Sequence, residues 1–364
     1  MAPADPALAR LVDQVRSARA AKGLLRITGG GSKDFYGGAL QGEPLDVRPL
    51  AGISSYEPSE LVVTVRGGTL LAELEAALAA QGQALAFEPP RLGPTSTIGG
   101  VIAAGLAGPA RASAGAVRDH VLGASLLDGR GEVLSFGGQV MKNVAGYDVS
   151  RALAGSMGAL GVICEVSLKV LPIATASATL RFECEQAEAL RRLNAWGGEP
   201  LPISASACWN GMLVLRLSGA RAAVEAALQQ LGGEGIESAL AAAFWAGLRN
   251  QHDEFFVSAA RAVEGGAALW RLGLPQTAPP LTLPGEQLVE WGGAQRWICS
   301  AAGAAAVREA AAALGGHATL YRSNDRSTPA FHPLAPAQRR IQRALMDACD
   351  PDHVFHRARL LTDA

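Results

Sequence analysis

The sequence contains few charged, aromatic and cysteine residues for its length of 364 residues. Charged residues make up 18% and aromatic residues 5%, and the formal net charge is −1. Without an excess of positive charge, the chain offers no broad surface to a polyanion, which argues against a nucleic-acid partner. Hydrophobic residues make up 49%. This fraction is typical of a globular protein, and with so few rings its core must be built mainly from Leu, Val and Ala.

Metal-ligand patterns are also missing from the sequence. No two of the five cysteines have the Cys-x-x-Cys spacing of zinc or iron–sulfur ligation, and no two of the six histidines pair at a convincing metal-binding spacing. An odd number of widely separated cysteines also argues against a disulfide framework. We therefore expect no metal site, and free thiols in a reducing, cytoplasmic compartment. The cysteines are Cys164, Cys184, Cys208, Cys299 and Cys349.

Apolar runs long enough to span a membrane are interrupted. The uncharged stretch 92–110 contains Pro94, Pro109 and five glycines, which break a spanning helix. The apolar residues of 8–15 have the spacing of an amphipathic surface helix, not of a signal peptide. We expect a cytoplasmic protein that reaches the inner face of the membrane only through partners.

The length predicts two packed domains, and the texture of the sequence changes near Pro172. Before this residue, short apolar strands alternate with glycine-rich turns; after it, glycine becomes rarer. We expect an α+β protein with domains at 1–172 and 173–330, the second an antiparallel sheet with helices on one face, and a C-terminal segment, 331–364, that returns to the first domain. Expected strands are 24–28, 61–65, 121–127, 132–136, 162–170, 178–184, 203–209, 212–218, 267–274 and 297–300; expected helices are 186–196, 221–231, 239–249 and 336–348.

Some single residues also have expected roles in these elements. The Thr69 hydroxyl should cap a helix that starts at Leu70, because it can accept from free main-chain N–H groups. Asp148 should cap a short helix, with Tyr147 packed beside it. In the helix 336–348, the spacing of apolar residues predicts that Ile341 and Leu345 face inward.

Three glycine-rich loops lie in the first half of the chain. Residues 29–32 follow a strand, residues 93–100 combine glycines with three hydroxyls, and residues 155–161 lead into another strand. Successive glycines can direct main-chain N–H groups into one concavity that binds phosphate oxygens, and a Cβ atom would obstruct a close pyrophosphate. No Walker loop occurs. Asp34 stands where a Rossmann fingerprint needs its last glycine, which disfavours nicotinamide binding by that fold.

The order of these loops resembles the FAD-binding half of the vanillyl-alcohol oxidase (PCMH-type) flavoprotein family. The similarity is tight over residues 20–172 and loose over much of the remainder. Two further runs, 137–148 and 291–297, resemble more closely the E subunits of bacterial glycolate oxidase. The family-wide runs are 26–33, 60–65, 97–100, 117–123 and 155–163.

This resemblance implies a PCMH-type FAD-binding domain followed by an α+β cap domain. The first loop should hold the FAD pyrophosphate, the second should approach the pyrophosphate and the isoalloxazine, and residues 158–163 should line the adenine side. Many relatives tether the flavin through His or Cys, whereas Lys33, Asp34 and Phe35 stand in the first loop here and His120 is expected to pack, so FAD should be non-covalent. The expected FAD-binding residues are Gly29, Gly30, Gly31, Ser32, Lys33, Pro94, Thr95, Ser96, Thr97, Gly99, Gly100, Gly105, Gly158, Gly161 and Ile163.

The C-terminal sequence departs from the family pattern. Relatives typically read Phe-Asn-Pro-Gly-Arg after an Asp-Pro turn, whereas Phe355 is followed here by His356-Arg357-Ala358-Arg359. The Asn that relatives place near the flavin is missing, which puts a flavin-side role of this segment in doubt. The metal-binding histidine cluster of related 2-hydroxy-acid-oxidising subunits is not found either, and no catalytic residue is assigned. Lys142 fits a place near the flavin as well as a solvated turn.

Three functions remain open at this point. The first is an FAD-binding subunit of a glycolate oxidase complex, in which a hydride leaves C2 of the substrate for the flavin and electrons pass to an iron–sulfur subunit. The second is a flavin-binding but non-catalytic assembly subunit beside a homologous FAD-containing catalytic subunit. The third is a stand-alone FAD-dependent 2-hydroxy-acid dehydrogenase. The implied partners are these two other subunits and a small 2-hydroxy acid.

Overall fold

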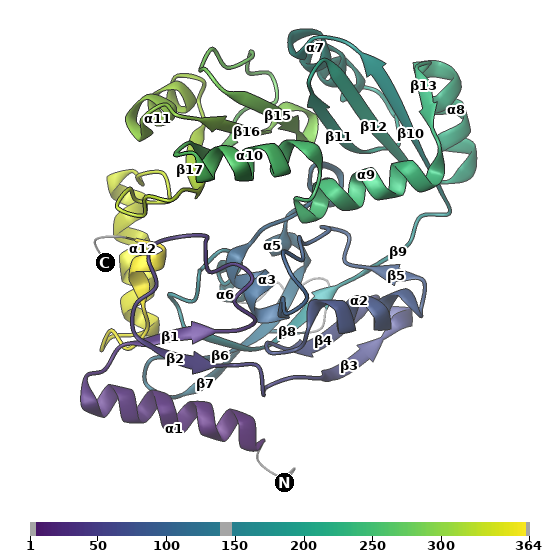
Figure 1. Ribbon diagram of the computed structural model, residues 1–364. Helices are drawn as coiled ribbons and strands as arrows, with labels where there is room; N and C mark the ends of the chain where they lie inside the picture. The colour runs from purple at the N-terminus through teal and green to yellow at the C-terminus, as the bar shows by residue number, and fades with distance from the viewer. Residues whose placement is uncertain (1–4, 139–147, 362–364) are drawn as a thin grey trace.

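Two large β-sheets organise the chain (Figure 1). The computed structural model describes residues 5–138 and 148–361. A five-stranded sheet lies in the lower half of the view and an eight-stranded sheet in the upper half. The strand β9 (Leu171–Pro172) ends the first half, and β10 (Ala176–Glu183) begins the upper sheet. The change of sheet therefore falls where the texture of the sequence changes.

The lower sheet is antiparallel, and its three central strands are buried on both faces. Its strands are β3 (Ile53–Glu57), β4 (Val62–Arg66), β8 (Val162–Lys169), β6 (Val121–Leu127) and β7 (Val133–Gly137), in that spatial order. Ile163 and Val166 of β8 join one core with α2 and α3, while Val162 and Cys164 join another under α1. Successive side chains of a strand point to opposite faces, so Val162, Ile163 and Cys164 at the start of β8 are all apolar and buried. The helices of this half are α1 (Pro6–Ala21), α2 (Leu71–Ala79), α3 (Ile98–Ala104), α4 (Arg111–Ala114), α5 (Val117–His120), α6 (Val149–Ala152) and the 3-10 turn η1 (Pro58–Glu60).

Two small sheets complete the lower half. The strand β1 (Leu25–Thr28) pairs in parallel with β2 (Glu43–Asp46), directly before the first glycine loop. The strand β5 (Gln83–Ala84) pairs antiparallel with β9.

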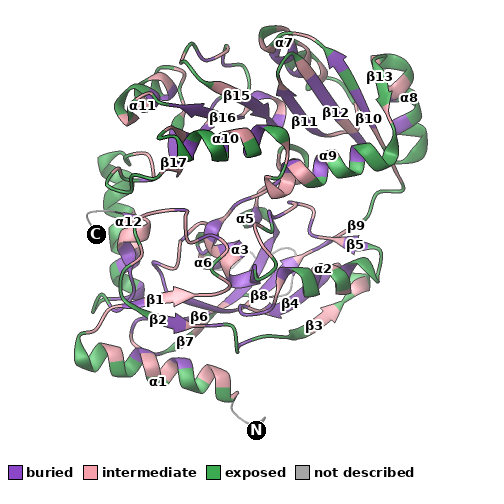
Figure 2. Ribbon diagram, in the orientation of Figure 1, coloured by how far each residue is buried: buried purple, intermediate pink, exposed green. Residues whose placement is uncertain are grey.

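The upper sheet is also antiparallel, but its helices cover both faces, so the expectation of helices on one face was wrong. Leu213 and Leu215 pack with α7 and α8, whereas Val214 between them packs with α9 and α10. Because the strands are apolar on both sides, each face needs a cover, and Figure 2 shows them largely buried. The strands, in spatial order, are β13 (Glu234–Ile236), β10, β12 (Met212–Gly219), β11 (Ile203–Trp209), β15 (Glu286–Glu290), β16 (Gln295–Ser300), β14 (Ala268–Gly273) and β17 (His317–Arg322). The helices are α7 (Gln186–Trp196), α8 (Arg221–Leu231), α9 (Ser238–Asn250), α10 (Glu254–Glu264), α11 (Ala304–Ala313) and the 3-10 turn η2 (Trp291–Gly293).

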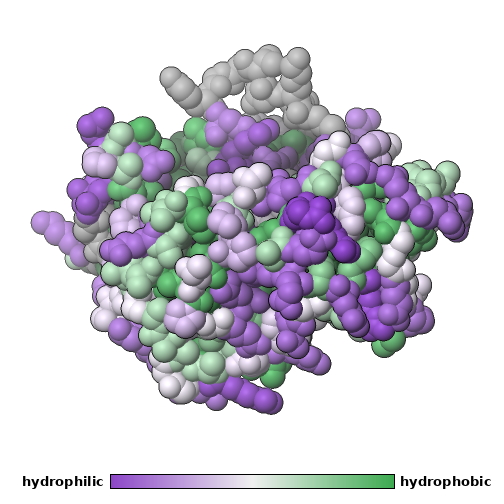
Figure 3. Space-filling model, turned by 90° about the horizontal axis from the view of Figure 1, so that it is seen from above, coloured by the Kyte–Doolittle hydropathy of each residue, from purple (hydrophilic) through white to green (hydrophobic). Residues whose placement is uncertain are grey.

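One hydrophobic core joins the two halves. It includes Tyr36 and Leu106 from the lower half together with Trp297 and Tyr321 from the upper sheet. None of the described helices combines the length and the apolarity needed to cross a membrane. Seen from above, the surface of the upper half mixes hydrophilic and hydrophobic residues (Figure 3).

The C-terminal segment returns to the lower half. The helix α12 (Pro336–Cys349) runs down beside it (Figure 1), and the 3-10 turn η3 (Arg357–Arg359) follows. Between them, Phe355 pairs in parallel with Leu25 of β1. The main chain bonds on both sides of this pair, from Leu25 N to Val354 O at 2.7 Å and from His356 N to Leu25 O at 2.9 Å. The chain thus places its C-terminal segment beside the N-terminal strand β1.

Most expected elements are confirmed, and two single-residue predictions were wrong. Thr69 does not cap α2, because its hydroxyl bonds both the N–H and the carbonyl of Gly52 at 2.9 and 3.1 Å. Ile341 does not face inward and is 68% exposed, because α12 is buried only towards its end, at Met346 and Cys349. Leu345 packs against the core from a partly buried position, and all five cysteines are free.

Candidate cofactor site

A pocket opens beside the first glycine loop. Its cavity volume is about 90 Å³, which is room for several waters, and the pocket is open to solvent on one side. Elements far apart in sequence line it: the loop after β1, the helix α3, the third loop with the start of β8, and Arg359 of the C-terminal segment. The lining residues are Ile27, Gly29, Gly30, Gly31, Ser32, Lys33, Asp34, Val47, Thr97, Gly99, Gly100, Ala103, Ala104, Met157, Gly158, Gly161, Val162, Ile163 and Arg359.

The structure brings most of the residues expected from the sequence to this pocket. All expected members of the first and third loops line it, as do Thr97, Gly99 and Gly100 of the second loop. Pro94, Thr95, Ser96 and Gly105 are not among the lining residues. Thr95 and Ser96 instead support the first loop from behind: the Thr95 hydroxyl donates to Gly30 O at 2.6 Å, and the Ser96 hydroxyl accepts from Lys33 Nζ at 2.7 Å.

The second loop lies so close to Gly29 and Gly30 of the first loop that neither position has room for a side chain. A Cβ atom on Gly30 would lie 1.5 Å from the carbonyl oxygen of Thr95, and one on Gly29 would lie 2.5 Å from Oγ1 of Thr97. From the sequence, the obstruction was expected at a pyrophosphate, whereas the structure places it at the neighbouring loop. Gly31 differs, since its φ of +71° is the left-handed conformation that favours glycine.

Main-chain N–H groups of the first loop are available to a ligand. The N–H groups of residues 29–33 donate to no acceptor among the described residues, although these residues line the pocket. In the second loop, by contrast, Gly99 N donates to Gly67 O at 2.7 Å and Gly100 N to Thr97 Oγ1 at 3.3 Å. The first loop therefore forms a nest suited to an anion, whereas these two amides of the second loop already have acceptors.

Lys33 adds a buried positive charge to this nest. Its side chain lies between the Ser96 hydroxyl and the Ser32 hydroxyl, at 2.7 and 3.4 Å from Nζ, and the residue is 9% exposed. Burial lowers the pKa of the Lys33 ammonium to about 8 because the charged form loses hydration. A bound anion would offset that cost.

Arg359 is one of several lining residues that were not expected from the sequence. Its Nη2 donates to the carbonyls of Lys33 at 3.1 Å and Tyr36 at 2.5 Å, so the guanidinium lies against the first loop. The C-terminal segment, whose flavin-side role was in doubt from the sequence, thus reaches the pocket with Arg359. Counted from Phe355, Arg359 matches the Arg of the relatives' Phe-Asn-Pro-Gly-Arg, and this match is the signal that could have identified it.

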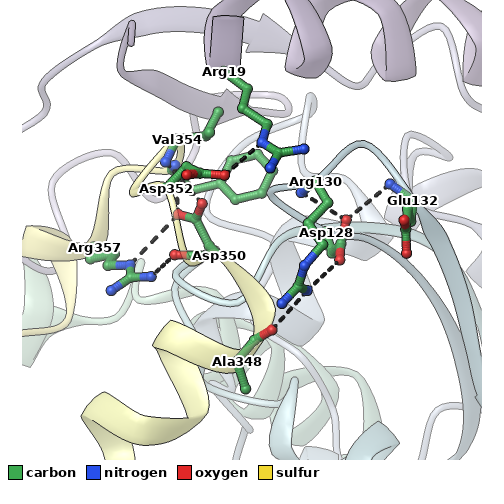
Figure 4. Close-up of polar contacts among 10 residues, drawn as sticks. Arg19, Asp128, Arg130, Glu132, Ala348, Asp350, Asp352, Val354 and Arg357 are labelled. Atoms are coloured by element: carbon green, nitrogen blue, oxygen red, sulfur yellow. Dashed lines mark hydrogen bonds and ion pairs between the residues drawn. The ribbon is translucent and has the colours of Figure 1, made fainter.

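The C-terminal segment is fixed by a buried polar network (Figure 4). The Asp350 carboxylate accepts from the main-chain N–H groups of Val354 and Phe355, both at 2.9 Å. Arg357 donates to main-chain carbonyls around it, including that of Asp350. Arg130 bonds the carbonyl of Ala348 at 2.9 Å from the lower half. The segment is therefore built to hold one conformation beside the pocket.

The other sequence candidates lie elsewhere. His120 is buried against Phe87, with Nε2 at 2.9 Å from the carbonyl of Ala114, so it packs as expected. Asp148 caps α6 as expected, accepting from Arg151 N at 3.3 Å. Lys142 and Tyr147, and most of the run 137–148, lie outside the described residues. Within residues 5–138 and 148–361, no group of three or more His, Cys, Asp or Glu residues could hold a metal ion.

A second, smaller cavity lies between the two halves. Its volume is about 20 Å³, enough for about one water. Glu290, which is 4% exposed, faces it and accepts from Gln295 Nε2 at 2.8 Å and Trp297 Nε1 at 2.6 Å. Burial raises the pKa of Glu290 to about 7. Arg271 Nε donates to Gln295 Oε1 at 2.6 Å, so the run 291–297 contributes two members of this network.

Comparison with known proteins identifies the family. The sequence is similar to the glycolate oxidase subunit GlcE of Escherichia coli (strain K12), with 44% identity over 353 residues that cover 97% of each chain. The chain belongs to the GlcE family. Residues 7–137 match a family model described as an FAD binding domain. The glycolate oxidase subunit GlcD of Bacillus subtilis (strain 168) is 32% identical over 120 residues, which cover 33% of this chain and 25% of that relative.

The fold is shared with a solved structure of much lower sequence identity. An alkyldihydroxyacetonephosphate synthase superposes with a TM-score of 0.64 at 14% identity, covering 94% of this chain and 73% of that one. The PCMH-type fold of this GlcE-family chain is thus confirmed, and FAD is its cofactor. The pocket fits such a group, because it pairs an open N–H nest and buried cations with walls of Gly and Ala.

Proposed function

We propose that this chain is the FAD-binding subunit of a complex that oxidises glycolate or a similar 2-hydroxy acid. The observation that carries the proposal is the 44% identity to a glycolate oxidase subunit along 97% of both chains. The similarity includes both halves, so it extends beyond the FAD binding domain that residues 7–137 match. The partners we propose are a homologous FAD-containing catalytic subunit and an iron–sulfur subunit that receives the electrons. The complex would work in the cytoplasm and reach the membrane only through these partners.

In this proposal, the pocket beside the first glycine loop holds FAD without a covalent link. The N–H groups of 29–33 and the ammonium of Lys33 would bind the diphosphate, and Gly158, Gly161 and Ile163 would face the adenosine part through main-chain atoms. Bound FAD supplies two-electron redox chemistry. We propose that residues 1–172 with 331–364 form the cofactor unit and that 173–330 form the cap.

The test is to purify the chain alone and together with its partner subunits. The isolated chain should show a flavin spectrum, and denaturation should release all of the flavin into the soluble fraction. Glycolate should reduce the flavin of the complete complex. Absence of flavin after gentle purification and after addition of FAD would refute the proposal, and flavin that stays with the denatured chain would refute the non-covalent link.

A second candidate is a non-catalytic assembly subunit. The dense packing of side chains between the two halves favours it. Tyr36, Tyr321, Trp297 and Phe256 pack there in succession, with ring centroids 5.3, 4.8 and 5.0 Å apart. The cavity beside these rings has room for about one water, which is smaller than a 2-hydroxy acid. Under this candidate, glycolate leaves the flavin of the isolated chain oxidised, and a complex whose other flavin subunit is inactivated does not turn over. Turnover of the isolated chain with an artificial acceptor would instead indicate a stand-alone dehydrogenase.

A further inference from the structure

Arg359 is a buried cation whose charge the protein leaves largely uncompensated. Its side chain is 11% exposed, and the carboxylate that pairs with it belongs to Asp34, with 3.8 Å between Nη1 and Oδ1. This distance exceeds that of a charge-assisted hydrogen bond. The same Asp34 carboxylate is shared with Arg26, at 3.9 Å. One acid thus faces two guanidinium groups, and hydrogen-bonds neither.

Other groups around Arg359 add positive charge or open hydrogen-bonding capacity. Burial, together with the neighbouring Arg326 and Arg26, lowers the pKa of Arg359, with Asp34 acting in the opposite direction. The Nε of Arg359 and both ring nitrogens of His356 are buried and have no partner among the described residues. A buried donor without an acceptor costs stability unless a ligand satisfies it. An anion in the pocket would supply an acceptor for the free Nε of Arg359.

The position of Arg359 is imposed by the scaffold. The pairing of Phe355 with Leu25 and the Asp350 network fix the segment on both sides of the residue that enters the pocket. Its Nη2 is then oriented by the carbonyls of Lys33 and Tyr36. The C-terminal segment therefore contacts the first glycine loop at the pocket wall. The loop contributes the ammonium of Lys33 and the segment contributes the guanidinium of Arg359.

We infer that Arg359 binds the diphosphate of FAD and that the C-terminal segment is a working part of the cofactor site. This inference rests on the proposed function, in which the first loop holds that diphosphate. Lys33, Arg359 and Arg26 each carry a positive charge, and Asp34 carries one negative charge, so two positive charges remain in excess. The two negative charges of a diphosphate match this excess. A guanidinium presents several donors in a fixed plane and is well suited to phosphate oxygens. The C-terminal segment lacks the Asn of the relatives, and it would bind the cofactor through the positive charge of Arg359 instead.

The test compares FAD with riboflavin, which lacks the diphosphate. Apo-protein of the wild type, R359Q, R359K and the control R326Q is titrated with each flavin, following flavin fluorescence at low and high salt. Arg326 is a matched control, because it donates to Asp34 O at 3.2 Å but does not line the pocket. We expect R359Q to weaken FAD binding about 10- to 100-fold, to leave riboflavin binding unchanged and to reduce the salt dependence for FAD. R359K should give a smaller loss, and R326Q less than about twofold.

The outcomes separate this inference from the proposed function. If the wild type binds FAD and R359Q binds it equally well, the inference is wrong and the proposed function stands. If R359Q loses riboflavin and FAD in equal measure while its melting temperature is unchanged, Arg359 acts on the ring system and the inference is again wrong. If R359Q fails to fold, R359K carries the test, and an FAD affinity equal to that of the wild type contradicts the inference. A wild-type chain that binds no FAD refutes both.

Discussion

The Nζ atom of Lys33 lies 2.7 Å from the Oγ atom of Ser96, so a lysine of the first glycine loop ends against the second loop. The two residues are 63 positions apart in the chain. Together with the bond from the Thr95 hydroxyl to Gly30 O, this contact joins the two loops behind the pocket. The wall of the cofactor site is therefore a single unit built from two loops, with a buried ammonium between them.

From the buried ammonium of Lys33, we predict that FAD affinity falls as the pH rises above about 8. The free protein holds the pKa of Lys33 at about 8 through burial, and a bound diphosphate favours the ammonium and raises that pKa. Binding then takes up a proton above pH 8, so affinity is lost with rising pH, by at most about tenfold per pH unit. FAD titrations from pH 6.5 to 9.5 measure this effect.

The variant K33Q serves as the reference for this pH dependence. It should bind FAD more weakly at pH 7 and show a nearly flat profile between pH 7 and 9. A wild-type profile that is equally flat would show that the diphosphate does not approach Lys33.

Gly30→Ala should disrupt the wall between the two loops. Its Cβ would lie 1.5 Å from Thr95 O, a main-chain atom that cannot move without shifting the second loop. We expect a loss of about 2–4 kcal/mol in the free energy of unfolding and a loss of FAD binding of tenfold or more. Gly235→Ala is the control, since a Cβ there meets nothing within 4 Å. Urea unfolding and FAD titration test both variants, and wild-type behaviour of Gly30→Ala would contradict the loop packing described.

The buried carboxyl group of Glu290 should make the free energy of unfolding depend on pH. We expect part of that free energy to be lost as the pH rises. Its pKa in the folded protein, about 7, lies above the ordinary 4.5, so the folded state binds the proton more tightly. The free energy of unfolding should therefore fall as the pH rises from about 4.5 to 7, by up to about 3 kcal/mol. E290Q should match the wild type near pH 5 and exceed it in stability near pH 8.

The control for Glu290 is E286Q. Glu286 also accepts from an indole N–H, that of Trp209 at 2.9 Å, but it is only half-buried. Thermal melts at pH 5 and 8 should show the pH-dependent difference for E290Q alone. Equal behaviour of the two variants would mean that Glu290 is ionised in the folded protein near pH 5.

Asp350→Asn should weaken the anchor of the C-terminal segment. Asp350 is fully buried and accepts from two main-chain N–H groups with its two carboxylate oxygens. An Asn offers one acceptor, so one N–H loses its partner, at a cost of about 1–3 kcal/mol. The control is Asp352→Asn, which breaks an ion pair with Arg19 whose side chains are both 45% exposed and should cost less than about 1 kcal/mol.

Hydrogen exchange distinguishes a local from a global effect of Asp350→Asn. Amides of residues 353–357 should exchange faster in this variant, while those of the lower sheet keep their protection. If Asp352→Asn destabilises the protein as much as Asp350→Asn, the anchor depends on the surface ion pair and not on the buried carboxylate.

The sequence predicted elements whose apolar pattern is local. The helices Gln186–Trp196 and Arg221–Leu231 and the strand Ile203–Trp209 have the bounds expected from their spacing. The helix α10 was missed although it carries Phe255 and Phe256, because such a short apolar cluster fits a loop or a strand equally well. Periodicity also cannot show whether a helix face is covered, which is why Ile341 was placed inward.

The site was predictable where it depends on main-chain geometry and unpredictable where it depends on long-range contact. Runs of glycine located the first and third loops, since few other residues permit such backbones. Nothing local shows that Thr95 and Ser96 turn away from the pocket while Arg359 enters it. Thr95 and Ser96 bond to the first loop, and the entry of Arg359 follows from the pairing of Leu25 with Phe355, which joins opposite ends of the sequence.

The same pairing sets an order of events during synthesis. Chains fold from the N-terminus as they leave the ribosome, and every lining residue of the pocket except Arg359 is translated within the first 163 positions. The glycine loops thus emerge long before the residue that completes their wall. While the upper half is being translated, the pocket of a nascent chain lacks the part of its wall that Arg359 forms. The wall is completed only when the segment after α12 reaches β1.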